Sequence, residues 1–220
     1  MELLEGIKTR RSFRAFKPDP VPQEVLRSIL ELARKSPSYT NTQPWEVAVV
    51  SGKRKDELSR ILLEMAKSGA TANPDIPLPR NWPPELGNRG REHRMKRFKF
   101  LGIDPDNEQQ REESRLRNFE LYGAPCAVFL FMDNTLSPWS IFDMGIFAQS
   151  LILAAHSFGV GSCLQAMLAI YPNAVREFLG IPKTKQLIIG ISMGYPDPEA
   201  RVNAYQSDRV SLDDFVQWYT

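Results

Sequence analysis

Apolar residues recur every three or four positions in several segments of this chain, which is the pattern of helices with one buried face. The pattern predicts helices at 3–7, 22–33, 53–68 and 171–179, and Gly69 and Gly180 stand where the last two would end. Short apolar runs predict strands at 46–51, 124–132 and 186–193. Helices and strands mix without regular alternation, so we expect an α+β layered fold rather than a doubly wound sheet.

The longest apolar segment, 139–158, is about long enough to cross a bilayer. It contains Asp143, Gln149 and His156, and no second apolar segment of this kind accompanies it. We therefore interpret it as a buried central helix that ends at Gly159, and we expect no membrane association. On this helix, the position of His156 favours a core histidine with satisfied hydrogen bonds over a catalytic one.

The composition changes after the helix predicted at 53–68. Five prolines between positions 74 and 84 exclude a continuous helix or a central strand over 70–86. Charged segments with helical character follow at 88–101 and 107–121, separated by 102–106. Residues 70–121 are therefore expected to form a long loop and helices that leave the core.

Composition and charge limit the class of protein. A chain of 220 residues with 42% hydrophobic content can bury an ordinary core, and its net charge of +2 argues against a protein that coats nucleic acid. Cys126 and Cys163 fit neither a disulfide framework nor a Cys-x-x-Cys motif. Residues 1–7 contain two glutamates and no long apolar run, so we expect no secretion signal and a cytoplasmic location.

Two segments carry most of the chemical information. Residues 8–14 read Lys-Thr-Arg-Arg-Ser-Phe-Arg, and guanidinium and hydroxyl donors at this density suit a phosphate group. Residues 36–45 read Ser-Pro-Ser-Tyr-Thr-Asn-Thr-Gln-Pro-Trp and offer hydroxyl and amide groups for a flat heterocycle. Taken singly, the first segment also suits a solvated helix end, and the second an ordinary loop between helix and strand.

Several common kinds of site lack their signatures. The chain has only two histidines, with no carboxylates at metal-ligand spacing to them, so no metal site is expected. It contains no Walker loop and no Gly-x-Ser-x-Gly motif, and the glycines at 159 and 161 follow a predicted helix rather than a strand. ATP, serine-hydrolase and Rossmann dinucleotide chemistry are therefore not indicated.

The ordered pair of motifs, Arg-Arg-Ser-x-Arg and Ser-Pro-Ser-x-x-Asn-x-Gln-Pro-Trp, resembles the flavin mononucleotide (FMN) signature of the nitroreductase family. The resemblance implies a single domain, 1–220, with a mixed central β-sheet flanked by helices and a helical lid at about 70–121. It implies an FMN-dependent oxidoreductase that carries electrons from NAD(P)H to a small electron-poor acceptor, such as a nitroaromatic or a quinone. Ping-pong kinetics and a homodimer with flavin sites across the interface are also implied.

The resemblance assigns the cofactor-binding residues. Arg10, Ser12 and Arg14, with Arg11 contributing, would hold the phosphate, and Arg209 in the Arg-Val-Ser-Leu-Asp-Asp ending would be a further ligand. The remaining expected contacts to the flavin are Pro37, Ser38, Asn41, Gln43 and the backbone of Leu164, Gln165 and Ala166. The side chain of Gln43 has the alternative role of bracing its own loop. No side chain is assigned as a catalytic acid or base, since the flavin carries the hydride.

A basic segment lies inside the expected lid. Residues 89–99 contain six arginines and lysines against Glu92 alone, and phenylalanines stand at 98 and 100. A solvated helix face, an anion-attracting lid and a nucleic-acid patch remain open, and the low net charge favours the first two. Expected substrate-facing residues are Tyr39, Thr40, Arg94, Arg97 and Phe98.

Two kinds of alternative function also remain open. A reductive dehalogenase or a flavin-fragmenting enzyme of the same superfamily would keep the flavin motifs and differ mainly in residues 70–121. A non-catalytic protein that stores flavin or binds nucleic acid through residues 89–99 is the alternative of another class.

Overall fold

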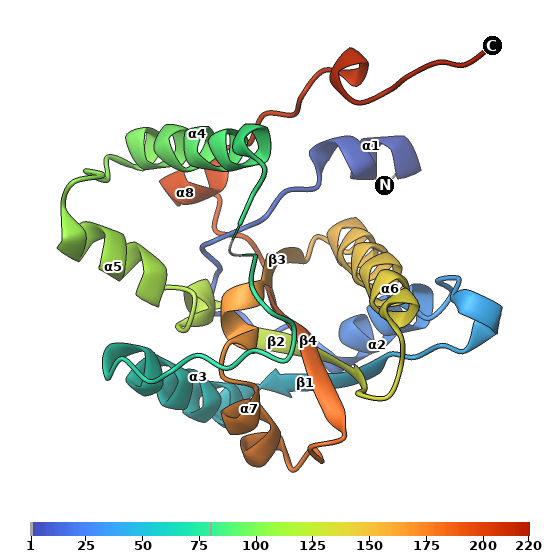
Figure 1. The fold of residues 1–220 in the computed structure, drawn as a ribbon. Coiled ribbons are helices and arrows are strands. Elements are labelled where there is room, and N and C mark those ends of the chain that lie inside the picture. The colour runs from blue at the N-terminus through green and yellow to red at the C-terminus, as the bar shows by residue number, and fades with distance from the viewer. Residues whose placement is uncertain (1, 80) are drawn as a thin grey trace.

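The structure is a computed structural model that describes residues 2–79 and 81–220 (Figure 1). In these residues the strands β1 (Glu46–Ser51), β2 (Cys126–Asp133), β3 (Gly161–Gln165) and β4 (Lys185–Gly194) form one sheet in the order β1-β2-β4-β3. All neighbouring strands pair antiparallel, and within the described residues the one parallel contact is an isolated bridge between Ser12 and Ser162. The predicted α+β class is confirmed, with antiparallel ladders where a mixed sheet was expected.

Strand β2 lies in the middle of the core because both of its faces are apolar. Ala127, Phe129 and Phe131 belong to one buried cluster, which also contains residues of α3 (Gly52–Lys67) and α7 (Pro172–Leu179). The alternate residues of β2 belong to a second cluster with α2 (Gln23–Ala33) and α6 (Pro138–Ser157). Figure 1 shows these two helix layers on opposite sides of the sheet. A continuous apolar run is the pattern of such a doubly covered strand.

The segment expected to form a lid contains α4 (Pro84–Leu101) and α5 (Glu108–Leu116), which lie away from the central sheet (Figure 1); the name lid is used below for these two helices. The predicted loop ends earlier than expected, because Pro84 occupies the first position of α4. An N–H at that position has no acceptor within the helix, so a proline there costs no hydrogen bond. The second lid helix also ends earlier than predicted. Leu121 and Tyr122 have φ values of 55° and 56°, which a helix does not accommodate.

The remaining helices are short or terminal. They are α1 (Leu3–Thr9), α8 (Arg201–Ala204) and the 3₁₀ turns Tyr39–Asn41, Leu121–Gly123, Ala166–Ala169 and Leu212–Asp214. After the last of these turns the chain extends away from the other elements (Figure 1).

The predicted central helix exists as α6, but only part of its surface is buried. Trp139 and Phe142 are 64% and 63% exposed, because the sheet and α2 cover only the opposite side of the helix. Among the described residues, α6 is the one helix with the length and apolar composition for a membrane span, and half of its most apolar window is packed inside the protein. The expectation of a wholly buried helix was therefore wrong for this face.

Candidate functional site

The arginine motif lies in the segment that follows α1 and is fixed to the core by backbone contacts. The N–H of Phe13 donates to the carbonyl oxygen of Ser162 at 3.0 Å, and the N–H of Arg14 donates to Oδ1 of Asn203 at 2.8 Å. Phe13 itself is buried. Because side chains alternate in direction along an extended segment and Phe13 enters the core, its neighbours Ser12 and Arg14 are left at the surface of the core.

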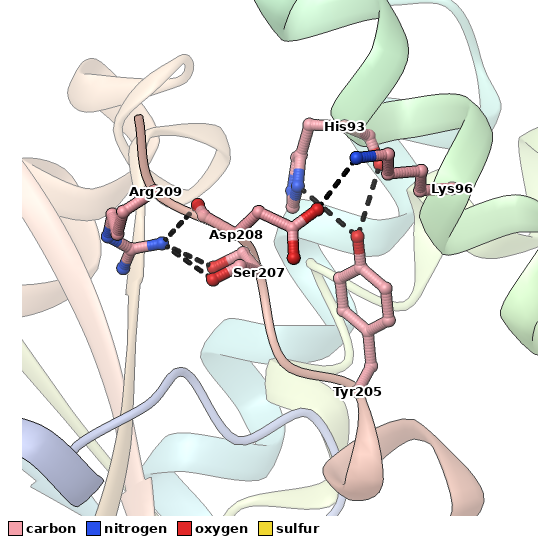
Figure 2. A network of polar contacts seen from close by, with 6 residues as sticks. All are labelled: His93, Lys96, Tyr205, Ser207, Asp208 and Arg209. Atoms are coloured by element: carbon pink, nitrogen blue, oxygen red, sulfur yellow. Dashed lines mark hydrogen bonds and ion pairs between the residues drawn. The ribbon is translucent and has the colours of Figure 1, made fainter. Parts of the chain in front are cut away.

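These side chains line a cavity of about 710 Å³ together with residues from distant parts of the chain. Its wall includes Arg10, Arg11, Ser12, Arg14, His93, His156, Tyr205, Ser207 and Arg209. Arg209, predicted as a further phosphate ligand, is therefore brought to the other four predicted residues. Its guanidinium donates to the carbonyl oxygens of Ser207 and Asp208 at 3.0 and 2.9 Å, which fixes its direction (Figure 2).

The cavity wall is strongly positive, since none of its described residues carries a carboxylate. Partial burial and the charge of Arg209 both lower the pKa of Arg10. Burial lowers the pKa of His156, as do Arg10 and Arg11, so its imidazole is biased toward the neutral form. Positive groups gathered without counter-charges form a site for an anion, because convergent guanidinium and hydroxyl donors bind phosphate oxygens strongly.

A second cavity of about 1010 Å³ adjoins the first along Arg14 and His93, which line both. Leu164, Gln165 and Ala166 line it on the side of the sheet. On the side of the lid it is lined by Arg94, Arg97 and Phe98, the residues predicted to face the substrate. An anion site thus leads into a larger space between the sheet edge and the lid.

A buried polar network holds the end of β3 at this second cavity. Nε2 of Gln165 donates to the carbonyl oxygen of Asn118 at 3.0 Å, and Oε1 accepts from the hydroxyl of Ser192. The hydroxyl of Tyr122 donates to Oδ1 of Asn118 at 2.9 Å. The side chain of Gln165 is consequently engaged in the protein, and a ligand in the cavity meets the exposed Leu164 and Ala166 beside it.

Cys163 also lines the second cavity. Burial raises the pKa of its thiol, which keeps the group protonated and a poor nucleophile. It therefore acts as a small residue packed in the core.

The second motif forms a separate loop at the beginning of α6. The N–H of Tyr39 donates to both carboxylate oxygens of Asp143 at 3.1 Å, and its ring stacks on Trp139 with centroids 6.3 Å apart. Asp143 is 3% exposed, so this anchor is buried. Thr40 and Asn41 have φ values of 47° and 59°, a backbone form that turns the loop sharply.

Within this loop the side chains of Gln43 and Ser38 brace the backbone. Nε2 of Gln43 donates to the carbonyl oxygen of Asn41 at 3.2 Å, which is the alternative role foreseen for this residue. The hydroxyl of Ser38 accepts from the N–H of Gln43 at 2.9 Å. Pro37 and Asn41 are exposed.

The structure does not bring the two motifs together within one chain. The loop lines neither cavity, so Tyr39 and Thr40 do not share a cavity with Arg94, Arg97 and Phe98. Asp143 and His156 mark the two ends of α6, and a rise of about 1.5 Å per residue separates them by roughly 20 Å. The cause is the anchoring of the loop by Asp143 at one end, while the arginine motif lies at the other.

One histidine of the site was misjudged from the sequence, and the place of the other could not be read from it. His156 is not a core histidine: it lies on the cavity wall, with Nε2 2.9 Å from Oγ1 of Thr9, because the segment after α1 passes over this end of α6. His93 is exposed, and it lines both cavities with its Nδ1 3.4 Å from the hydroxyl of Tyr205. Among the residues that the structure describes, no group of three or more His, Cys, Asp or Glu side chains is placed to hold a metal ion.

Comparisons with known proteins agree with the motifs. Residues 7–195 match the model of the Nitroreductase family. The nitroreductase NfnB of Mycolicibacterium smegmatis is 38% identical over 96% of this chain and 90% of its own, and a 4-nitrobenzoate reductase of Pseudomonas putida is 32% identical over 96% and 93%. The crystal structure of NfnB from Mycobacterium smegmatis superimposes over the whole of both chains with a TM-score of 0.94. The chain belongs to the nitroreductase family.

Proposed function

We propose that this protein is an FMN-dependent oxidoreductase that passes electrons from NAD(P)H to an electron-poor acceptor such as a nitroaromatic or a quinone. The observation that carries the proposal is the anion cavity that opens, along Arg14 and His93, into the larger cavity under the lid. The crystal structure of the Mycobacterium smegmatis relative is of an FMN-dependent nitroreductase in complex with NADPH, and the Pseudomonas putida relative is a 4-nitrobenzoate reductase.

The residues of the first cavity fit the phosphate of FMN. Nε of Arg14 is buried and has no hydrogen-bond partner among the described residues, although buried donors are nearly always paired. An anion that accepts from Arg14 would satisfy this atom, and Arg10, Ser12 and Arg209 would supply the other donors. The backbone of Leu164, Gln165 and Ala166 would then lie along the flavin.

When bound, FMN supplies the chemistry of hydride transfer between donor and acceptor. The chain positions and shields the reactants: the network of Asn118 and Gln165 keeps the end of β3 rigid, and α4 and α5 limit water in the larger cavity. One cavity serves donor and acceptor in turn, which gives ping-pong kinetics. We assign no side chain as catalytic acid or base.

Anaerobic spectroscopy of the purified protein tests the function. We expect FMN to be released on denaturation, its absorbance in the native protein to be bleached by NADPH, and the absorbance to recover with a nitroaromatic. Bleaching without recovery, but with recovery by a halogenated aromatic, would identify a reductive dehalogenase instead. A bound flavin that NAD(P)H does not reduce would leave a non-catalytic flavin protein, and loss of the flavin spectrum during turnover would indicate flavin fragmentation.

We further infer that two copies of the chain complete the flavin site. Trp139 and Phe142 expose a large apolar face on α6, and Phe215 and Trp218 in the tail are 67% and 77% exposed. A two-fold axis across α6 would place the beginning of the partner's α6 beside the end of this one. The partner's loop of residues 37–43 would then lie beside the arginine motif. This arrangement supplies the half of the site that one chain lacks.

Sedimentation with FMN titration tests this dimer. We expect the wild-type protein to be a dimer, and the double variant Trp139→Glu, Phe142→Glu to become a monomer that no longer retains FMN. A wild-type monomer of 25.1 kDa that binds FMN stoichiometrically would overturn the inference.

For the remaining properties we propose a cytoplasmic protein without nucleic-acid or membrane partners. Both cysteines are free and buried, and the net charge is only +2. Residues 70–121 act as the lid of the single domain in this proposal.

A further inference from the structure

The lid presents arginines to the larger cavity that form no ion pair with the described residues, although the carboxylate of Asp106 also lines this cavity. Arg94, Arg97 and Arg111 line the cavity, and no ion pair reaches any of them from the described residues. Arg115 lines the same cavity but is paired with Glu112 at 2.6 Å. Within the described part of the chain, three lid arginines of this cavity are thus left without an ion pair, as is Arg14 on the opposite side.

Arg97 is the most constrained of the three. Its side chain is half-buried, and it lines the larger cavity together with Arg14, Tyr122 and Cys163. Burial and the charge of Arg14 lower the pKa of its guanidinium. The group is therefore partly removed from water and repelled by another arginine that lines the same cavity. An anion beside it would relieve both effects.

Apolar side chains lie beside the Arg97 guanidinium or line the same cavity. The ring of Phe98 lies with its centroid 5.8 Å from the Arg97 guanidinium carbon, and Met95 and Met167 line the same cavity. Phenylalanine and methionine provide a surface for an aromatic ring, and a guanidinium at its edge matches a carboxylate in two parallel hydrogen bonds. The combination suits a small aromatic acid better than a neutral aromatic.

We propose that Arg97, assisted by Arg94, binds a carboxylate on the electron acceptor, so that the protein selects nitroaromatic acids over neutral nitroaromatics. The inference rests on the proposed function and names the class of acceptor. The phosphate of FMN beside Arg14 and a phosphate of NADPH are the other anions that these arginines would attract, and the FMN phosphate is already in place in the loaded enzyme. The acceptor fits Arg97 better, because the 2′-phosphate of a dinucleotide is remote from its nicotinamide, whereas Arg97 lies near the residues of β3 where the reacting ring must be.

The test compares matched acids and amides. The enzyme loaded with FMN is reduced anaerobically and mixed in a stopped-flow instrument with 4-nitrobenzoate or 4-nitrobenzamide, which differ chiefly in charge. In parallel, binding of the unreactive 4-chlorobenzoate and 4-chlorobenzamide to the oxidised enzyme is measured by calorimetry. The variants are Arg97→Gln and Arg94→Gln. Arg91→Gln is the control, because Arg91 lies on the same helix, is exposed and lines none of these cavities.

We expect Arg97→Gln to weaken 4-chlorobenzoate binding and to slow oxidation by 4-nitrobenzoate by about tenfold or more, the scale of a lost charge-assisted hydrogen bond. The effect on the amides should be much smaller, Arg94→Gln should act in the same direction more weakly, and the control should match the wild type. The wild type alone provides a further check, since raising the salt concentration should reduce its preference for the acid.

Three results would overturn the inference. If Arg97→Gln weakened binding and slowed oxidation equally for the acids and the amides, Arg97 would have a structural role only. If the wild-type enzyme showed no preference for the acids, the proposed selectivity would be wrong, whether or not the variants fold. A loss confined to flavin reduction by NADPH, with NADH unaffected, would assign the arginines to the donor's phosphate. Failure of the proposed function is separate, because an enzyme that reduces no nitroaromatic still reports on the carboxylate site through 4-chlorobenzoate binding.

Discussion

The backbone N–H of Phe13 donates to the carbonyl oxygen of Ser162 at 3.0 Å, so the arginine motif is bonded directly to the outer strand of the sheet. The opposite side of β3 pairs with β4, and Ser162 also forms a bridge with Ser12. The segment that gathers phosphate donors and the strand that lines the larger cavity are therefore one structural unit. We use the word seam for this contact between residues 12–13 and Ser162. A substitution that separates the two segments at the seam should change the shape of both cavities.

Gly161 lies at this seam, and we predict that Gly161→Ala destabilises the protein. The added Cβ would be 2.6 Å from Cγ of Pro196 and 2.7 Å from the Phe13 ring, which forces the seam apart. Overpacking of this kind costs about 1 to 3 kcal/mol of the free energy of unfolding, measurable by urea denaturation. Gly90→Ala is the control, since a Cβ added there on the α4 surface would meet nothing within 4 Å. Equal stability of both variants would contradict the packing argument.

Arg10→Ala should weaken FMN binding by roughly 1.5 to 3 kcal/mol, the contribution of a hydrogen bond to a charged group. The physical reason is the loss of one of the convergent donors in the smaller cavity. Fluorescence titration of the apoprotein with FMN gives the affinity. Lys17→Ala removes a nearby exposed charge that lines neither cavity and should bind like the wild type. An unaltered dissociation constant in folded Arg10→Ala would exclude Arg10 from the site.

His156 should titrate below its ordinary pKa of 6.5 in the apoprotein, because burial and then Arg10 and Arg11 disfavour its charged form. Its contribution to stability is accordingly present above the unfolded pKa and is lost as pH falls through the lower folded pKa. FMN in the cavity adds negative charge, so the pKa should rise on binding. Proton NMR of the two histidines measures both values, with His93→Gln providing the assignment. A His156 resonance indifferent to FMN would separate it from the anion site.

Asp208→Asn should loosen the lid without lowering global stability. Nζ of Lys96 lies 2.7 Å from Oδ2 of Asp208, and this pair connects α4 to the segment that carries Arg209 (Figure 2). Both side chains are largely exposed, and exposed pairs add little to the free energy of unfolding. We expect faster amide hydrogen exchange over 84–101 in the variant, with 52–67 as the internal reference. Identical exchange over α4 would show that this ion pair does not hold the lid.

The sequence predicts those parts of the fold and site that depend on local patterns. The strand at 46–51 has the predicted bounds, and the doubly apolar run that became β2 was recognised by its continuous hydrophobicity. The arginine motif and Arg209 were identified as members of one site, and the structure places them around one cavity. Such features are visible because residue type and spacing alone carry the information.

The features that the sequence did not predict depend on which distant segments pack against a residue. Strand β3 is five residues long and includes glycine and cysteine, so its pairing with β4 gives little signal in the sequence. A helix as uniformly apolar as α6 does not reveal which face stays exposed, and Trp139 was therefore expected to be buried. His156 was misread because helical spacing does not show that a segment from the N-terminus covers it. Asp143 was noted only as a charge, while its role as the anchor of Tyr39 requires the tertiary structure.

The positive wall shared by Arg10, Arg14 and Arg209 has a consequence for the abundance of the protein in a cell. Like charges brought together by folding oppose the folded state, and an anion that binds there shifts the balance back by mass action. The apoprotein therefore opens more often than the loaded protein, and proteases act on opened chains. The supply of the anionic cofactor should therefore set how much of the protein is present at steady state, as well as what fraction of it is loaded. The rate at which the protein is degraded in the cell then reports how much cofactor is available.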